Sequence, residues 1–153
     1  MQTEFIIRDY REGDKAVLME ISLPWLEANH ILEPADIDQL THPERVLEAG
    51  GRILLAEADG RPVGMMMLEP FGNGVAEPFK FGVLEAYRNR GMGRALMEAT
   101  IDAARAMGVR TLVLTSHHSL KAALHIYESY GFRYEEHDHV AFELSDIAMK
   151  KEL

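Results

Sequence analysis

The residue types of an anion-binding loop come together in one seven-residue segment, made of Arg88, Asn89, Arg90, Gly91, Met92, Gly93 and Arg94. This segment precedes the most regular helical pattern of the chain. The first turn of a helix is positive, because its N–H groups lack partners within the helix and its peptide dipoles align. Three arginines there favour an external anion, and the two glycines let backbone N–H groups approach it. The segment therefore predicts a phosphate or pyrophosphate site.

Two common phosphate-binding motifs do not fit this segment. A P-loop requires the pattern GxxxxGK[ST], which does not occur in the chain. A dinucleotide-binding fingerprint requires a third small residue after GxG, where this chain has Leu96, and it follows the first strand of a βαβ unit. The segment instead follows a predicted β-meander. A nucleotide-dependent enzyme is therefore the least favoured of the functions considered.

The elements that must position this loop follow from hydrophobic patterning. Short apolar runs predict strands over 3–8, 52–58, 63–68, 75–83, 111–115, 132–136 and 140–144. Helical periodicity begins at Lys15, continues in pieces over 25–48, is clearest over 91–107, and returns after Ser119, which we expect to cap a helix that ends at Gly131. This order predicts an α/β fold with a mixed sheet and helices on its faces.

Prolines and one turn mark the expected boundaries. Pro24 should break or kink the first helix, because proline lacks an N–H and clashes with the preceding turn. Pro34 and Pro43 should break the pieces over 25–48. The pair Asp59-Gly60 between two apolar runs predicts a hairpin. Pro78 within 75–83 indicates an edge strand or a bulge, because proline cannot donate to a β-ladder.

The composition predicts a single domain over residues 1–153, ordinary in its charged and apolar content. The net charge of −9 argues against a nucleic-acid or anionic-membrane partner. The absence of cysteine excludes disulfides, thiolate metal sites and a cysteine nucleophile. No apolar run approaches the length of a membrane span, and the first residues do not resemble a signal peptide. We therefore expect a soluble, cytoplasmic protein.

With these elements in place, the chain resembles the GNAT superfamily of N-acetyltransferases. The pattern Arg88-x-x-Gly91-x-Gly93 is similar to the family signature Q/R-x-x-G-x-G/A. The preceding run from Glu77 to Arg88 resembles the family pattern E-x-x-K-x-x-V-x-P-x-Y-R, and the run from Ile126 to Phe132 resembles a later family segment. The resemblance is therefore specific over residues 77–132 and weaker elsewhere.

The resemblance implies a mostly antiparallel twisted sheet of about seven strands with about four helices. It also implies direct transfer of an acetyl group from acetyl-CoA to a primary amine. The 88–94 loop would hold the pyrophosphate, and the backbone of Phe81, Gly82 and Val83 would pair with the pantetheine arm and supply an oxyanion donor. Ser119 stands where the family often has asparagine, which leaves the coenzyme contact of that longer amide in doubt.

The same resemblance suggests which groups move protons. Tyr127 would protonate the leaving thiolate, although spacing alone also fits a core aromatic, and Tyr130 remains an alternative donor. Glu77 is the candidate base for the ammonium group, with a solvated strand residue as the competing interpretation. His117 and His118 follow the 111–115 strand and could relay a proton, although exposed loop histidines are common.

The acceptor is less well defined. Residues 27–48 carry six acidic side chains and one basic one, which favours a cationic amine, either a small molecule or a protein amine. The alternative function is a module that senses acetyl-CoA without catalysis. His137 and His139 have the spacing of two metal ligands on one strand face, but no third ligand is evident, so we expect no metal. Edge strands could support a homodimer.

Overall fold

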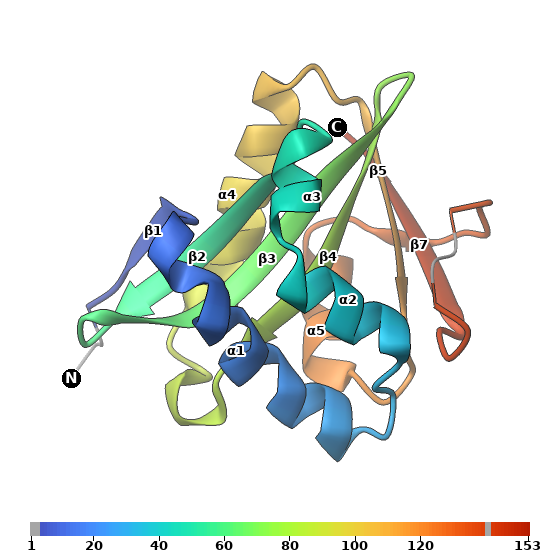
Figure 1. Cartoon of the computed structure of the whole chain (residues 1–153). Helices are drawn as coiled ribbons and strands as arrows, with labels where there is room; N and C mark the ends of the chain where they lie inside the picture. The colour runs from blue at the N-terminus through green and yellow to red at the C-terminus, as the bar shows by residue number, and fades with distance from the viewer. Residues whose placement is uncertain (1–3, 140–141) are drawn as a thin grey trace.

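The computed structural model describes residues 4–139 and 142–153 (Figure 1). Their strands form one seven-stranded sheet in the order β1-β2-β3-β4-β5-β7-β6. Within it only β4 and β5 are parallel, and every other neighbouring pair is antiparallel. The strands are β1 (Ile6–Asp9), β2 (Arg52–Ala58), β3 (Arg61–Gly72), β4 (Val75–Val83), β5 (Thr111–Ser116), β6 (Arg133–Tyr134) and β7 (Ile147–Glu152).

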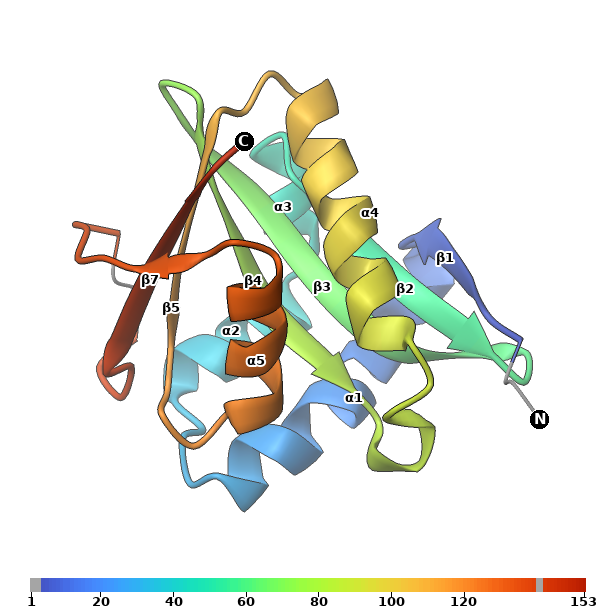
Figure 2. The ribbon, with the colours of Figure 1, turned by 180° about the vertical axis from the view of Figure 1, so that it is seen from behind.

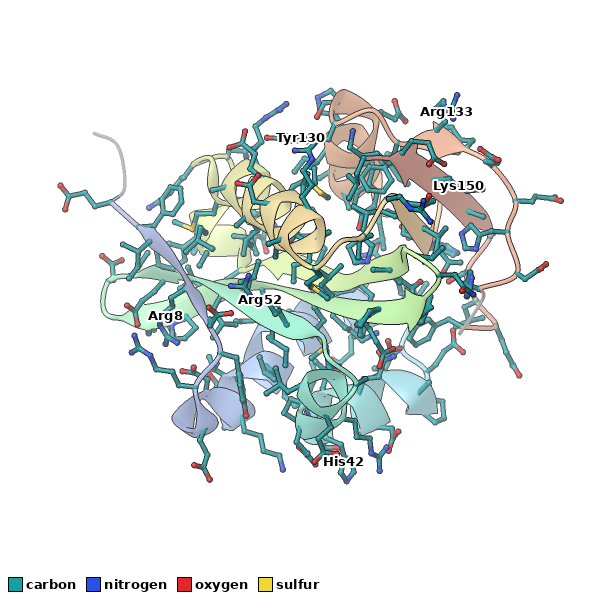
Figure 3. All side chains as sticks on the ribbon, turned by 90° about the horizontal axis from the view of Figure 1, so that it is seen from above. Arg8, His42, Arg52, Tyr130, Arg133 and Lys150 are labelled. Carbon is teal, nitrogen blue, oxygen red and sulfur yellow. The ribbon has the colours of Figure 1, made fainter. Side chains whose placement is uncertain are left out.

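Helices cover both faces of this sheet. The three N-terminal helices pack on one face and the other two on the opposite face (Figures 1 and 2), and the view from above shows the sheet between the two layers (Figure 3). The helices are α1 (Lys15–Ala28), α2 (Pro34–Thr41), α3 (Glu44–Glu48), α4 (Met92–Ala106) and α5 (Lys121–Ser129). The predicted α/β class with a mostly antiparallel sheet is confirmed. None of the helices in the described ranges is long and apolar enough to cross a membrane.

The hydrophobic core lies on both sides of β3. Met65 and Met67 are buried under α1–α3, whereas Met66 is buried under α4 and α5. This alternation follows from the two-residue period of a strand, which sends successive side chains to opposite faces. The three methionines are therefore core residues of a central strand.

The parallel strands β4 and β5 separate soon after they meet. They pair only at Val75 with Thr111 and at Ala76 with Leu112. Farther along, β4 bulges against β3, so that two of its residues, Lys80 and Phe81, have no register partner between Phe79 and Gly82. Lys80 has a φ of 53°, which belongs to the left-handed region. The bulge predicted near Pro78 is present, but β4 is an interior strand, not an edge. Among the described residues, none pairs with β4 beyond Ala76 on the side of β5.

The strand predicted over 140–144 is absent from its described part, residues 142–144. Residues 140 and 141 lie outside the described residues, Phe142 has no regular secondary structure, and Glu143 and Leu144 belong to a turn. The closing strand is β7, which pairs with β5 over six residues and buries Met149 completely. The alternation of apolar side chains over 140–144 is the stronger local pattern. Tertiary pairing with β5 overrides it, because β5 needs a second hydrogen-bonding neighbour.

Two expected boundaries differ from the structure. Helix α1 continues through Pro24 to Ala28, because buried Ile21 and Leu26 anchor the helix on both sides of this exposed residue. Ser119 does not cap α5, whose N-cap is Leu120. In contrast, Pro34 occupies the first turn of α2, where its missing N–H costs nothing.

Candidate active site

A cavity of about 490 Å³ opens where β4 and β5 separate. The ends of α1 and α5, the start of α2 and the 142–145 segment complete its wall. The sequence-predicted residues that line it are Glu77, Phe81, Gly82, Val83, Arg88, Asn89, Met92, Gly93, Ser119 and Tyr127. Segments far apart in the chain thus meet in one cavity.

The glycine-rich loop forms one end of this cavity. Gly91, at the N-cap of α4, has a φ of 86°, a conformation that favours glycine. Within the described residues no side chain caps α4, and its first turn carries no acidic group. A Cβ on Gly93 would lie 2.9 Å from Cδ1 of Ile126 and 3.3 Å from Cζ of Phe81. The first turn of α4 therefore packs closely and leaves its N–H groups for a ligand.

The arginines of the loop have different surroundings. Arg88 Nε donates to the Val83 carbonyl oxygen at 3.1 Å, which ties the loop to the end of β4. The Arg90 guanidinium lies 5.4 Å from the Tyr87 ring centroid. Arg94 lies over the Tyr130 ring at 5.8 Å. Of the predicted coenzyme-binding residues, Arg90, Gly91 and Arg94 are near the cavity but not in its wall.

Glu77 is a buried carboxyl group on β4, with 7% of its surface exposed. Burial raises the pKa of Glu77 to about 7. The nearby Lys80 opposes this shift, whereas Glu69, which pairs with Glu77 across β3 and β4, adds to it. A carboxyl group with this pKa can accept a proton near neutral pH, the condition for a general base. The interpretation of Glu77 as a solvated strand residue is wrong.

Tyr127 reaches the cavity from α5 and is 6% exposed. Its ring packs against Phe81 and Phe132, with centroid distances of 5.9 and 5.7 Å. Burial raises the pKa of its phenol, and the nearby Glu77 carboxylate adds to this shift. The phenol therefore keeps its proton at neutral pH. Tyr130 instead lies on the outer side of the α4–α5 layer (Figure 3), where its hydroxyl donates to Glu98 at 2.7 Å.

A charged network that the sequence did not predict forms the other end of the cavity. Lys80 Nζ lies 2.5 Å from Asp36 Oδ1, and both side chains are almost fully buried. The Glu33 N–H donates to Asp36, and the Glu33 carboxylate accepts the N–H groups of Glu143 and Leu144. This network links α2, the bulge of β4 and the 142–145 segment. Pairs 44 or more residues apart leave no local signal in a sequence.

Trp25 is a second cavity residue that the sequence analysis missed. It lies near the end of α1, with its indole against the backbone of Gly82. Its position beside a helix proline gave no reason to connect it with β4. The only signal was that it is the single tryptophan of the chain.

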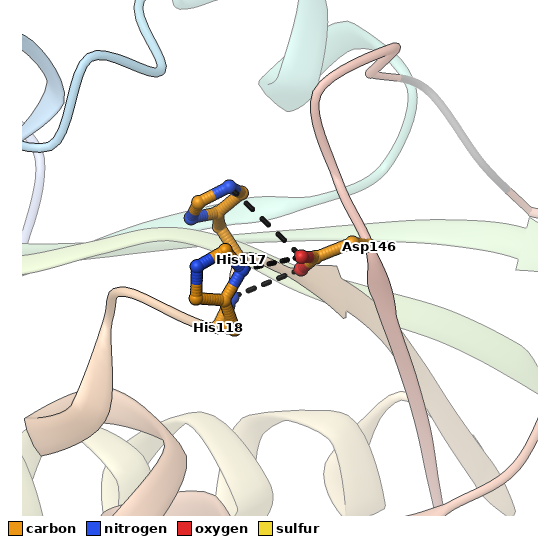
Figure 4. Close-up of side chains that lie close together, drawn as sticks. All are labelled: His117, His118 and Asp146. Atoms are coloured by element: carbon orange, nitrogen blue, oxygen red, sulfur yellow. Dashed lines mark hydrogen bonds and ion pairs between the residues drawn. The ribbon is translucent and has the colours of Figure 1, made fainter.

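His117, His118 and Asp146 form a cluster at the rim of the cavity (Figure 4). Asp146 accepts the N–H of His118 at 2.9 Å and is 2.5 Å from His118 Nδ1, while His117 Nε2 is 4.0 Å away. Two ligand atoms bound to one zinc ion, each at about 2.0–2.2 Å from the metal, lie farther from each other than the 2.5 Å between His118 Nδ1 and Asp146. The geometry therefore favours a hydrogen-bonded contact between the segment that follows β5 and the segment that precedes β7. Of the two histidines, only His117 lines the cavity, with Nδ1 2.7 Å from the Ser119 hydroxyl.

The other predicted imidazole pair does not converge on one point. His137 Nε2 lies 2.8 Å from the Leu114 carbonyl oxygen, whereas the His139 ring stacks on Phe71 at 4.6 Å. Their ring centroids are 6.1 Å apart. Each ring thus has a separate partner within the described residues.

Comparison with known proteins places this site in a family. Residues 16–132 match the model of the acetyltransferase (GNAT) family. A GNAT-family acetyltransferase from Staphylococcus aureus Mu50 superposes with a TM-score of 0.89 at 20% identity, covering 97% of this chain and 99% of that chain. The PaiA N-acetyltransferase of Thermoplasma acidophilum, solved with coenzyme A, has a TM-score of 0.79 at 18% identity, with coverage of 98% and 99%. The yncA protein of Salmonella typhimurium, solved with its cofactor acetyl-CoA, has a TM-score of 0.80 at 19% identity, with coverage of 98% and 94%.

Proposed function

The chain belongs to the acetyltransferase (GNAT) family, and on this premise we propose that it transfers the acetyl group of acetyl-CoA directly to a primary amine. The acceptor is a small cationic molecule or an exposed protein amine. The observation that carries the proposal is the wedge between β4 and β5, which joins a glycine-rich loop to a buried carboxyl group and a buried phenol.

The wedge has the shape that an extended coenzyme arm needs. Beyond Ala76, β4 has no partner on the side of β5 within the described ranges, so a pantetheine arm can pair with the backbone of Phe81–Val83 as an added strand. The arm then leads to the first turn of α4, where N–H groups and Arg88 meet the pyrophosphate. This path runs along one wall of the cavity and brings the thioester toward the bulge.

The acid and the base flank that path. Glu77 takes a proton from the ammonium group, directly or through water, and the free amine attacks the thioester carbon. The new C–N bond forms, the C–S bond breaks, and the Tyr127 hydroxyl donates its proton to the thiolate. The second proton of the amine nitrogen then leaves, directly or through water, and restores the phenol. Both pKa shifts fit these roles, because Glu77 can ionise near neutral pH while Tyr127 remains protonated.

The charge at the acceptor end supports a cationic amine. Glu33 and Asp36 are the members of the acidic 27–48 stretch that line the cavity, and Glu77 adds a third carboxyl group. Lys80 pairs with Asp36, and the carboxyl groups of Glu33 and Glu77 are the other charged groups of this end. The two other cations of the wall, Arg88 and Lys121, belong to the glycine-rich loop and to α5. The other acids of the stretch are exposed, and one of them, Asp38, pairs with Arg45.

The test is an acceptor panel of polyamines, amino acids, aminoglycosides and basic peptides, each incubated with acetyl-CoA and the full chain. Free thiol and the mass of one added acetyl group are measured together. Turnover confined to cationic amines is expected. Preference for a neutral or anionic acceptor would contradict the charge argument, and coenzyme binding without turnover on any amine would favour the sensor alternative.

A further inference from the structure

The indole of Trp25 presents its N–H edge to β4. A methyl group on Gly82 would overlap Nε1 and lie 2.9 Å from Cδ1 and 3.1 Å from Cε2, so the edge of the indole that carries the N–H group contacts the strand. Asn29 Nδ2 donates to the Trp25 carbonyl oxygen at 2.7 Å and helps to hold this turn of α1. The backbone around Trp25 is therefore fixed, and Gly82 is the residue that makes room for its ring.

This N–H group is buried and has no hydrogen-bond acceptor within the described part of the chain. A buried donor without a partner destabilises the fold, and nearly all such groups in folded proteins find a partner. Trp25 and Gly82 both line the cavity. An acceptor atom on a bound ligand would satisfy the donor.

The position of Gly82 indicates which ligand atom this is. Gly82 directly follows the bulge of β4, in the stretch that is not paired with β5. The inference rests on the proposed function, which brings the thioester to this point. We propose that Trp25 Nε1–H donates a hydrogen bond to the thioester carbonyl oxygen of acetyl-CoA and to the oxyanion formed from it.

Trp25 keeps its proton throughout this reaction. When the amine attacks the carbonyl carbon, the π electron pair of the C=O bond moves to the oxygen, and the indole N–H faces the resulting negative charge. The oxyanion then collapses, the C–S bond breaks, and the thiolate receives its proton from Tyr127. A donor already aimed at this oxygen lowers the barrier, because no reorganisation is needed when the charge develops.

Nuclear magnetic resonance tests this contact directly, since the only tryptophan of the chain gives a single indole N–H signal. Uniformly ¹⁵N-labelled full chain is titrated with acetyl-CoA and, separately, with coenzyme A, which lacks the thioester carbonyl. Both ligands should move the backbone signals of Gly91 and Gly93, but acetyl-CoA alone should move the indole signal downfield. An indole signal that moves equally with both ligands, or with neither, overturns the inference. If no backbone signal moves either, the proposed function fails as well.

Kinetics of Trp25→Phe give a second test, because phenylalanine keeps an aromatic ring but removes the N–H donor, together with part of the volume of the indole. We expect kcat and kcat/KM to fall together by about 10²-fold, the usual effect of losing one oxyanion donor. Coenzyme affinity and melting temperature should stay close to wild type. Leu18→Met is the control, because it alters the buried face of the same helix outside the cavity. A lower melting temperature and weaker coenzyme binding with unchanged kcat would assign Trp25 a packing role and overturn the proposal.

Discussion

The two ends of the cavity are formed by different kinds of groups, backbone N–H groups at one end and side chains at the other. At the 88–94 loop, one continuous segment supplies backbone N–H groups, two glycines and an arginine tied to β4. Under α1 and α2, three separate parts of the chain meet, and charged side chains hold them together through an ion pair and hydrogen bonds. A backbone site recognises a group common to many ligands, whereas a site made of distant side chains can differ between relatives. We infer that the loop end binds the coenzyme and that the network end selects the acceptor.

The largest effect is expected from a substitution at the loop end of the cavity. Gly93→Glu places a carboxylate against the pyrophosphate and should weaken acetyl-CoA binding by at least about 10³-fold, equivalent to about 4 kcal/mol. Calorimetric titration with acetyl-CoA measures it. Gly93→Ala is the matched control, because it brings the same contact with Ile126 without the charge and should lose far less affinity. Equal losses in the two variants would mean that packing, not phosphate binding, explains the glycine.

The second largest effect is expected from a substitution at the network end of the cavity. Asp36→Asn leaves the buried Lys80 ammonium without its ion-pair partner and should destabilise the fold by about 3–5 kcal/mol, measured by urea unfolding. The double variant Asp36→Leu with Lys80→Met removes both charges and should recover most of that stability. The KM for the acceptor should be higher than that of wild type in both variants. A single variant as stable as wild type would show that the pair contributes nothing to the fold.

Between the two ends, Tyr127→Phe should lower kcat by about 10²-fold, the scale of general acid catalysis, with coenzyme affinity nearly unchanged. Steady-state kinetics and calorimetry separate these quantities. Tyr130→Phe is the control, because its hydroxyl contacts Glu98 outside the cavity and should leave kcat unchanged. If the two variants lose activity equally, Tyr127 is not the acid.

The smallest expected effect concerns pH. The proposed mechanism needs ionised Glu77, so kcat/KM should rise with pH through about 7. Glu77→Gln should lower kcat/KM near pH 8 by about 10²-fold and flatten this limb. The free energy of unfolding should change in the opposite direction and fall as pH rises. A carboxyl group whose folded pKa is raised stabilises the fold at low pH, and this contribution is lost as pH rises from about 4.5 to about 7.

At about 1.4 kcal/mol per pKa unit, this loss amounts to about 3 kcal/mol above pH 7, so Glu77→Gln should gain stability relative to wild type between pH 4 and pH 8. Thermal melting at both pH values checks the sign. A stability difference between variant and wild type that does not change with pH would contradict the buried, raised-pKa carboxyl group.

The same contrast explains which features were predictable from the sequence. The loop around Gly91 and the turn after Asp59 depend on neighbouring residues, so their local pattern is sufficient. The ion pair of Asp36 and Lys80 depends on a tertiary contact between α2 and β4, and nothing near either residue predicts it. Strand β7 was missed for a related reason. Its two lysines make it look like a polar tail until its pairing with β5 is known.

Thermal melting of the chain with acetyl-CoA, ATP and NADH, each in a separate sample, tests the central claim most directly. A ligand at 100 times its dissociation constant adds about 2.7 kcal/mol of stability, which raises the melting temperature of a domain of this size by about 5–10 °C. We predict this rise with acetyl-CoA and none with ATP or NADH. A rise with ATP or NADH and none with millimolar acetyl-CoA would mean that the loop holds another phosphate, and would contradict the proposed acetyl transfer.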